Sequence, residues 1–425
     1  MKKSLGMHIY VTGVNHSSTP IEIRERLAVS SNHLSEALGL LGNFIKQGLI
    51  LSTCNRVEVY SVSNGAASQQ AVDFLKAHAN VSGAELLPYI YCFQNEAAIR
   101  HLFRVTSGLD SLIIGEFEIL GQAKNSLEEA EKAGLVGHPL RTLWHHALGV
   151  GRQVREVTGI SRNPLSVSSV AVEQAAKAIG DLTRCKALVI GTGEAGRLVA
   201  KALKERGVSR ITTTSRSYEK ASAMAKMLGG SSVDIGSLGL ELTSCDITIS
   251  CTGAPHFILD LKTLENVMAS RGNRPLAIID IAVPRDVDPE VKHLSNVFLY
   301  DIDDFTHISE RNRKQRESEI SKANQIIESE VKRFSFQWQA MEAKSVISSL
   351  VEKADTIRQA QLKRTLKKLP QLTAEEKQSL EAMTQAIVQK ILHHPIQHLK
   401  QDTEEGEDYI RLVTELFQLD RNKPE

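Results

Sequence analysis

One short segment constrains the fold more than any other: a strand, a glycine-rich turn and a helix in direct succession. The apolar run 187–190 leads into Gly191-Thr192-Gly193-Glu194-Ala195-Gly196, and an amphipathic run over 197–206 follows. A G-x-G-x-x-G motif alone is weak, but a strand before it and a helix after it make it specific. The glycines let the backbone approach a pyrophosphate at a helix N-terminus. The segment therefore predicts a Rossmann-type domain in which these six residues bind a dinucleotide.

The next strand of this domain indicates which dinucleotide is bound. It covers 211–214 and ends in Ser215-Arg216-Ser217, where NAD-specific domains usually carry an acid for the ribose 2′-hydroxyl. A cation and hydroxyls favour a 2′-phosphate instead, so Ser215 and Arg216 predict NADPH. The alternative is that Arg216 is a solvated surface cation. Further strands at 247–250 and 276–281 extend the predicted sheet.

A second segment places a cysteine at the tip of two strands. An apolar run leads up to Thr53 and is read as a strand, the three positions 54–56 interrupt it, and alternation resumes at Val57. Cys54 lies at this tip beside Thr53, Asn55 and Arg56. A guanidinium near a thiol favours the nucleophilic thiolate. The alternative is a small buried core residue, which is what most free cysteines are.

Residues 7–93 give the order β-α-β-β-α-β. Strands are predicted at 7–14, 48–53, 57–62 and 86–93, with helices over 34–45 and 69–79 between them. This order is typical of a ferredoxin-like domain. Further helices are predicted at 95–105 and 116–134.

The last third of the chain is predicted to be helical. No proline occurs between 303 and Pro370 and no glycine before Gly406, and apolar residues recur at steps of three and four. Thr373 to Glu376 form a capping box, whose helix is expected to end near Pro395, and another helix fits 409–419. So small a unit buries little alone and should pair with a second copy; the alternative is a bundle that closes on its own chain.

Composition narrows the remaining possibilities. At 425 residues the chain should form two or three domains, and a formal net charge of +1 gives no global field for nucleic acid, although a local basic face would suffice. The five cysteines form no C-x-x-C pair, which favours a reduced, cytoplasmic protein without a zinc cage. We see no signal peptide and no run of about 18 apolar residues, so no membrane association is expected.

Four stretches together carry a resemblance to a known family. Ser52-Thr53-Cys54-Asn55-Arg56-Val57-Glu58-Val59-Tyr60 resembles the signature of glutamyl-tRNA reductase. The other three run over 13–25, 107–122 and 280–286, in the same order as in that family. The resemblance implies NADPH-dependent reduction of glutamyl-tRNA(Glu) to glutamate-1-semialdehyde through a thioester on Cys54. This is the first step of five-carbon tetrapyrrole (porphyrin and haem) synthesis.

The resemblance also assigns roles to individual residues. It implies a second activity-linked residue at His101 and substrate contacts at a set of positions, namely Thr53, Asn55, Arg56, Ser111, Glu116, Phe117, Glu118 and Gln122. Arg56 would pair with a substrate carboxylate. The chain departs from the family at Phe117 and Glu118, where proline and glutamine are commoner. The alternatives are a structural histidine at 101 and, for Glu116, an acid facing a helix dipole.

The predicted architecture is an α/β chain of four parts. A ferredoxin-like α+β catalytic domain (1–163) that binds glutamyl-tRNA precedes a Rossmann-type NADP domain (164–302), a long spinal helix (303–345) and a helical dimerisation domain (346–425). The resemblance implies a homodimer, with glutamate-1-semialdehyde aminotransferase as a candidate partner. Two other functions fit parts of the chain: an NADPH oxidoreductase of the shikimate-dehydrogenase type, which needs no cysteine, and a tRNA-binding regulatory protein without turnover.

Overall fold

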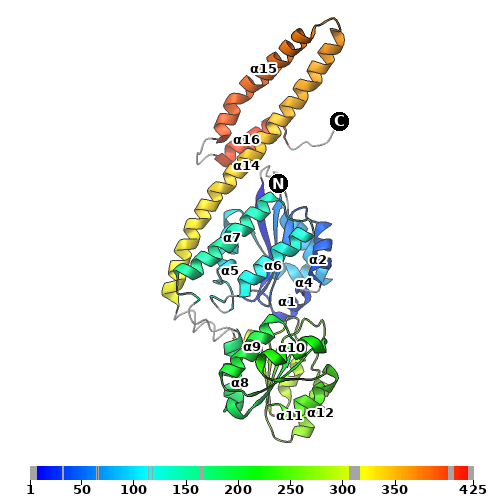
Figure 1. The fold of residues 1–425 in the computed structure, drawn as a ribbon, viewed down its shortest axis with the longest axis vertical. Coiled ribbons are helices and arrows are strands. Elements are labelled where there is room, and N and C mark those ends of the chain that lie inside the picture. Colours follow the sequence, from blue (N-terminus) through cyan, green and yellow to red (C-terminus); the bar gives the residue numbers. More distant parts are fainter. Residues whose placement is uncertain are drawn as a thin grey trace.

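The computed structural model describes residues 7–30, 33–63, 65, 67–112, 114–116, 118–161, 167–305, 316–400 and 406–419. The molecule is elongated, with the domain built on the first sheet in the middle (Figure 1). The domain built on the parallel sheet lies at one end, and a helical hairpin lies at the other. The arrangement of three domains around a long helix agrees with the predicted fold class.

The sheet of the first domain has the predicted ferredoxin-like topology. Its strands are β1 (His8–Asn15), β2 (Gly48–Ser52), β3 (Arg56–Ser63) and β4 (Tyr91–Gln94), in the order β2-β3-β1-β4. All neighbouring strands are antiparallel. The helices are α1 (Ile21–Leu27), α2 (Leu34–Gly42), α3 (Ala67–Ala79), α4 (Gly83–Leu86), α5 (Glu96–Thr106), α6 (Glu118–Lys132) and α7 (His138–Val157).

The prediction of a strand over 86–93 is wrong for the first half of that range. Residues 83–86 form α4, and Leu87–Tyr89 form a 3-10 turn, so the strand begins only at Tyr91. Ser82 caps α4 by accepting from the Glu85 amide, and Pro88 has no amide to donate to a sheet. Local capping therefore overrides the apolar run that indicated a strand.

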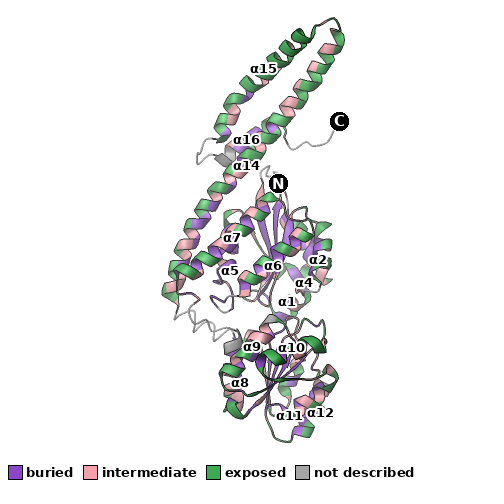
Figure 2. Cartoon of the chain, in the orientation of Figure 1, coloured by how far each residue is buried: buried purple, intermediate pink, exposed green. Residues whose placement is uncertain are grey.

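Both faces of this sheet are covered, as the buried strands of the middle domain show (Figure 2). In β3, Arg56, Glu58 and Tyr60 share one face because side chains alternate along a strand. This face is covered by α5, through His101, and by α7, through Trp144 packed edge-on against Tyr60. Three polar side chains of β3 are thereby enclosed in the core.

The second domain is a doubly wound parallel sheet in the order β10-β9-β8-β5-β6-β7. Its strands are β5 (Lys186–Ile190), β6 (Arg210–Thr214), β7 (Ser231–Ser232), β8 (Ile247–Ser250), β9 (Leu276–Asp280) and β10 (Val297–Asp301). Its helices are α8 (Val167–Ile179), α9 (Glu194–Glu205), α10 (Tyr218–Leu228), α11 (Leu238–Ser244) and α12 (Leu261–Arg271). The order reverses between β5 and β8, which is where such sheets bind ligands. The sequence also predicts that Ser166 caps a helix over 166–179, but Ser166 lies outside the described residues.

The last part is built on the helix α14 (Glu317–Lys368). Its first half packs on α5 and α7, and its second half pairs with α15 (Ala374–Lys400) and α16 (Gly406–Leu416) (Figure 1). The capping box at the start of α15 is confirmed: Thr373 and Glu376 exchange hydrogen bonds between side chain and backbone. The boundary predicted at 345 falls inside this uninterrupted helix.

The predicted end of α15 near Pro395 is wrong. The helix continues to Lys400 with Pro395 inside it. A proline removes one helical hydrogen bond, but Leu392 and Leu399 on either side are buried in the core of the hairpin. This packing holds both halves of α15 in one helix. Within the described helices, none is long and apolar enough to cross a membrane.

Candidate active site

The connection between β2 and β3 is a tight turn that presents Cys54. The Thr53 amide donates to the Arg56 carbonyl at 2.9 Å, which closes the turn. The Thr53 hydroxyl accepts from the amides of Asn55 and Arg56 at 3.1 and 3.2 Å. The Asn55 carbonyl in turn accepts from the His16 amide at 2.8 Å. The polar residues that break the apolar run therefore fix the backbone around the cysteine.

Gly13 of β1 is required by the neighbouring strand. It pairs directly with Glu58 in the sheet register. A Cβ at position 13 would lie 2.3 Å from the Val57 carbonyl oxygen and 2.9 Å from Cγ of Glu58. The missing side chain makes the space through which the Glu58 side chain passes.

Cys54 lies at the junction of two domains. Its half-buried side chain packs against an apolar cluster that joins Ile21 and Leu112 of its own domain to the core of the dinucleotide-binding domain, and its carbonyl oxygen accepts from Nη1 of Arg24 at 2.7 Å. Burial, followed by the nearby carboxylates Glu116 and Glu118, raises the pKa of the Cys54 thiol to about 12, and Arg24 opposes this rise. In the state described here the thiol is therefore protonated at neutral pH.

The prediction that the guanidinium of Arg56 stabilises a Cys54 thiolate is wrong. The guanidinium points into the core instead. Its Nη1 donates to Glu58 at 2.9 Å and its Nη2 to the Asp110 carbonyl at 2.5 Å. The Arg56 side chain is also almost fully buried, at 1% exposure. The cation that acts on the thiol is Arg24.

Glu58 is the centre of a buried polar network. Its carboxylate accepts from Arg56, from the Tyr60 hydroxyl at 2.6 Å, and from the Tyr91 hydroxyl. Burial alone would raise the pKa of the Glu58 carboxyl, but Arg56, His101 and these hydrogen bonds hold it well below its usual range. Glu58 is thus ionised and fully partnered.

His101 belongs to the same network. Its Nε2 lies 2.8 Å from Oε1 of Glu58, and its Nδ1 lies 3.8 Å from Oδ2 of Asp110. The ring also lies 4.9 Å from that of Phe93. Both ring nitrogens therefore face carboxylates of the protein, which indicates that His101 positions Glu58 and Asp110.

The segment between α5 and α6 brings further predicted residues to the junction. Ser111 and Glu116 are buried, and a hydrogen bond from Ser111 to Glu116 partly offsets the burial that raises the pKa of the Glu116 carboxyl. Glu118 begins α6 and acts electrostatically on Cys54. Gln122 lies one turn further along α6, whereas Phe117 is outside the described residues.

Glu58 and Arg24 are the site residues that the sequence reasoning missed. The signal for Glu58 was its spacing: opposite charges two apart in a strand share one face, and Tyr60 follows on that face. For Arg24 the sequence carries no such signal, because α1 also contains Arg26 and two glutamates. The Arg24 guanidinium also acts with that of Arg56 and with burial to lower the pKa of His16 to about 4, so His16 is neutral.

The glycine-rich turn fits a dinucleotide. Gly191 has φ 108°, and a Cβ there would lie 2.7 Å from the Cys251 carbonyl oxygen. A Cβ on Gly196 would lie 2.5 Å from Sγ of Cys251, whereas one on Gly193 would meet nothing within 4 Å. The first and third glycines thus pack the turn and helix together, and the second leaves its space open for a phosphate.

A cavity of about 840 Å³ lies over this turn. Its lining includes Gly191, Thr192, Gly193, Ser215, Arg216, Ser217 and Lys220. The predicted cofactor residues Gly191, Thr192, Gly193, Ser215 and Arg216 therefore all line this cavity. Ala195 and Gly196 follow at the start of α9. Arg216 is exposed and forms no ion pair within the described part of the chain.

Two buried carboxylates fix the backbone around Thr252, which lines this cavity. Asp286 accepts from the Ser250 hydroxyl and from the amide and hydroxyl of Thr252, at 2.6–2.7 Å. Asp280 accepts from the amides of Ala282, Asp286 and Val287. Burial and the neighbouring Asp286 raise the pKa of Asp280 to about 8. The loop 281–287 is thereby tied to the turn that follows β8.

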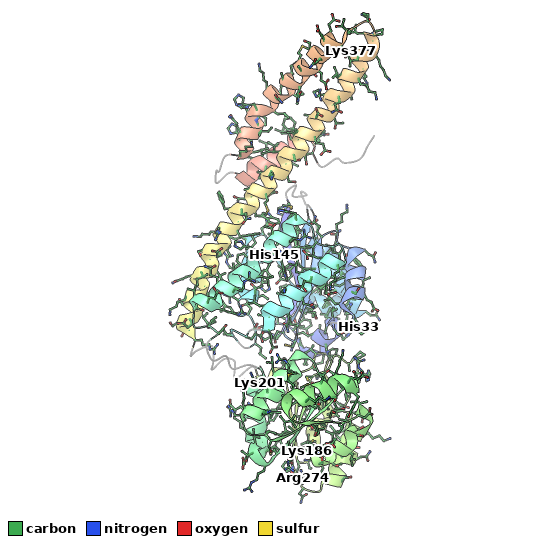
Figure 3. All side chains as sticks on the ribbon, viewed as in Figure 1. His33, His145, Lys186, Lys201, Arg274 and Lys377 are labelled. Atoms are coloured by element: carbon green, nitrogen blue, oxygen red, sulfur yellow. The ribbon has the colours of Figure 1, made fainter. Side chains whose placement is uncertain are left out.

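A second cavity, of about 860 Å³, lies between the two domains and shares Gly253, His256 and Phe257 with the cofactor cavity. His33 lines it from the foot of the catalytic domain (Figure 3). His145 instead lies exposed on α7, away from this junction (Figure 3). Across the described residues, no cluster of side chains could hold a metal ion.

A doubly wound sheet whose glycine-rich turn lies under a cavity, joined to a second domain with a cysteine at the junction, is typical of a nicotinamide-dependent oxidoreductase of α/β class. Three family models match the chain in succession. They are the N-terminal domain of glutamyl-tRNA reductase (12–158), shikimate / quinate 5-dehydrogenase (173–308) and the dimerisation domain of glutamyl-tRNA reductase (322–419). The chain belongs to the glutamyl-tRNA reductase family.

Full-length relatives support this assignment. The chain is 38% identical to "Glutamyl-tRNA reductase" of Syntrophotalea carbinolica, over 97% of this chain and 95% of that protein. It is 40% identical to the protein of that name from Carboxydothermus hydrogenoformans, over 97% of this chain and 93% of the relative. The solved "Glutamyl-tRNA Reductase from Methanopyrus kandleri" is 28% identical with a TM-score of 0.53, covering 97% of this chain and 99% of the other. The shikimate-dehydrogenase alternative therefore accounts for one domain only.

Proposed function

We propose that this protein reduces the glutamyl group of glutamyl-tRNA(Glu) to glutamate-1-semialdehyde with NADPH, the first step of five-carbon tetrapyrrole synthesis. The observation that carries the proposal is the position of Cys54. The cysteine lies on the catalytic domain, at the apolar cluster through which this domain meets the domain that carries the dinucleotide cavity. A group bound to its sulfur would thus lie at the boundary between the two domains.

Cys54 acts as the nucleophile in this proposal. Its thiolate attacks the ester carbonyl carbon, the bond to the ribose oxygen breaks, and the tRNA leaves with a proton on that oxygen. The product is a thioester, whose carbon stays electrophilic because sulfur donates weakly into the carbonyl. The bound cofactor supplies the hydride that this carbon accepts. Breaking of the carbon–sulfur bond then releases the aldehyde and restores the thiolate.

The surrounding residues have supporting roles in the proposal. Thr53 and Asn55 hold the turn, while Ser111, Glu116, Glu118 and Gln122 lie on the segment that approaches it. Because Arg56 and His101 are committed to Glu58, we assign them to positioning this wall of the site. The substrate carboxylate expected to contact Arg56 would first have to displace Glu58 or Asp110.

One assay tests the proposed reaction. Purified protein should oxidise NADPH when given glutamyl-tRNA(Glu) and should not do so with free glutamate. Binding of the tRNA without NADPH oxidation would contradict the proposal and favour a tRNA-binding regulatory protein. Turnover with a small hydroxy acid would favour the shikimate-dehydrogenase type instead.

The preference for NADPH is assigned to Arg216, with Ser215 as its neighbour. Arg216 lines the cofactor cavity and is free to meet a 2′-phosphate. A hydrogen bond to a charged group contributes about 1.5–3 kcal/mol. We therefore expect Arg216→Ala to weaken NADPH roughly 10- to 150-fold and to leave NADH almost unchanged. The ratio of kcat/KM for the two cofactors measures this.

Lys201→Ala provides a control, because Lys201 is an exposed cation of α9 outside that cavity (Figure 3). It should leave the ratio as in the wild type. An unchanged ratio in Arg216→Ala would remove Arg216 from the cofactor site and leave Ser215, Ser217 or the backbone to hold the phosphate.

We also propose that the helical hairpin forms a homodimer. Met383, Ile387 and Ile391 of α15 are 50–64% exposed, and a groove of about 500 Å³ lies beside them, between α14, α15 and α16. Figure 2 shows that α15 is largely exposed along its length. So large an apolar face on a small unit is typical of an interface.

Ile387→Glu together with Ile391→Glu should convert the dimer to a monomer, because two charges would be buried without partners. Sedimentation of the full chain measures this. Leu240→Glu is the matched control, since Leu240 is an exposed apolar residue of α11 in the other domain. A dimer that survives the double substitution would place the interface elsewhere.

We also propose that the product passes to glutamate-1-semialdehyde aminotransferase and that the protein is cytoplasmic.

A further inference from the structure

One guanidinium connects the nucleophile to the neighbouring domain. Arg24 is 2% exposed in its side chain, and each of its three nitrogens has a partner. Nε donates to the Thr19 carbonyl at 3.1 Å, Nη1 to the Cys54 carbonyl at 2.7 Å, and Nη2 to Oδ1 of Asp303 at 2.5 Å. The first two acceptors belong to the catalytic domain.

Asp303 belongs structurally to the other domain. It begins a 3-10 turn two residues after β10, and Phe305 of this turn is buried in the core of the dinucleotide-binding domain. The pair with Arg24 therefore exists only while the two domains lie as they do here. A salt bridge between one buried and one half-exposed side chain joins them.

The helix α1, which carries Arg24, makes a second contact across the junction. Glu25 of α1 accepts from Nε and Nη2 of Arg285, both at 3.1 Å. Arg285 lies on the loop 281–287, which Asp280 and Asp286 tie to the cofactor cavity. The helix α1 thus contacts both the loop 281–287, through Glu25, and the turn that carries Asp303, through Arg24.

We propose that Arg24 is a positioning residue for Cys54 and that Asp303 controls it, so that the placement of the dinucleotide-binding domain sets the reactivity of the nucleophile. The inference rests on the proposed function. With Asp303 in place, the charge of Arg24 is neutralised and its guanidinium acts as a clamp on the Cys54 backbone. With Asp303 withdrawn, the full positive charge of Arg24 faces the cysteine.

The other charged groups around Cys54 strengthen this effect. Glu116, from the turn before α6, and Glu118, at the start of α6, both disfavour the thiolate, and Arg24 of α1 is the cation that opposes them. The negative charge of Asp303 beside Arg24 weakens the effect of Arg24 and so disfavours the Cys54 thiolate, as Glu116 and Glu118 do. The thiol is then protonated when the domains are closed and ionises more readily when Arg24 is unpaired.

The proposal implies different domain placements for attack on the ester and for hydride transfer. Attack on the ester needs the thiolate and is favoured when Asp303 lies away from Arg24. Hydride transfer needs no thiolate, because the sulfur is then acylated, and it requires the cofactor-carrying domain to lie close. The same ion pair that closes the junction would thus lower the reactivity of free Cys54 between turnovers.

Alkylation of Cys54 by iodoacetamide tests this without any tRNA. The rate is followed at Cys54 alone by peptide mass spectrometry between pH 6.5 and 9.5. We expect Asp303→Asn to raise the rate about 3- to 10-fold at each pH, since half to one unit of pKa changes the thiolate fraction by that factor. Arg24→Gln should lower the rate, and Arg24→Lys should restore part of it because the charge returns.

Two controls separate charge from access. Arg285→Gln loosens the same junction without touching Arg24, so it should raise the rate only while Arg24 is present and not in the Arg24→Gln background. Arg26→Gln removes an exposed cation of α1 that pairs with Glu85 and should leave the rate unchanged. In an Arg24→Gln background, Asp303→Asn should have no further effect, because Asp303 acts through Arg24. Faster alkylation that persists in this double variant, or an unchanged rate in Asp303→Asn, would overturn the proposal. Either result would leave the assay of glutamyl-tRNA reduction unaffected.

Discussion

Replacement of Cys54 by serine should abolish reduction of glutamyl-tRNA while the protein remains folded. A serine hydroxyl without an adjacent general base is a poor nucleophile, and the histidine of the Glu58 network, His101, already faces Glu58 and Asp110. We expect kcat to fall by a factor on the order of 10³ or more. Steady-state NADPH oxidation measures the loss.

A matched substitution checks that the effect belongs to this thiol. Cys92 is an exposed cysteine of β4 in the same domain, so Cys92→Ser should keep wild-type turnover. Without NADPH, the wild-type protein should accumulate a glutamyl thioester on Cys54 that mass spectrometry detects. Near-normal turnover in Cys54→Ser, or no thioester under single-turnover conditions, would exclude the covalent mechanism.

The backbone of the site was predictable because it depends on local patterns. Alternation in 48–62 located the turn of Cys54, and the motif at 191–196 located the cofactor cavity through φ and packing requirements of its glycines. The strand order of both sheets then followed from known connection rules. Where local patterns conflicted, as at Pro88 and Pro395, capping or distant packing decided the outcome.

The electrostatics of the site were not predictable in this way. Proximity in sequence placed Arg56 beside Cys54, but alternation along β3 turns its side chain into the core toward Glu58. The cation that reaches the cysteine, Arg24, is thirty residues away and meets it only through the tertiary fold. A pKa depends on such distant neighbours and on burial, neither of which a single sequence displays.

The buried network of Glu58 leads to a prediction for stability. Glu58→Gln keeps the size of the side chain but removes its charge, which leaves the Arg56 guanidinium buried without a carboxylate. Breaking a buried ion pair in this way costs about 3–5 kcal/mol. The amide nitrogen of glutamine would also face the donors Tyr60, Tyr91 or Arg56. Unfolding of the catalytic domain should therefore shift to markedly lower urea concentration, as reported by Trp144, which packs against Tyr60.

The pH dependence gives this prediction a second readout. Because the folded-state pKa of Glu58 is depressed, its contribution is fully present above the unfolded value of about 4.3 and is lost as pH falls below it. The stability of Glu58→Gln should lack this acid-dependent part, so that the two proteins converge in stability toward low pH. Glu85→Gln breaks an exposed pair with Arg26 and should cost at most about 1 kcal/mol at any pH. If Glu58→Gln unfolded at the wild-type urea concentration at pH 7, Arg56 would have another partner, and Glu58 could not be the group that holds this wall of the site in place.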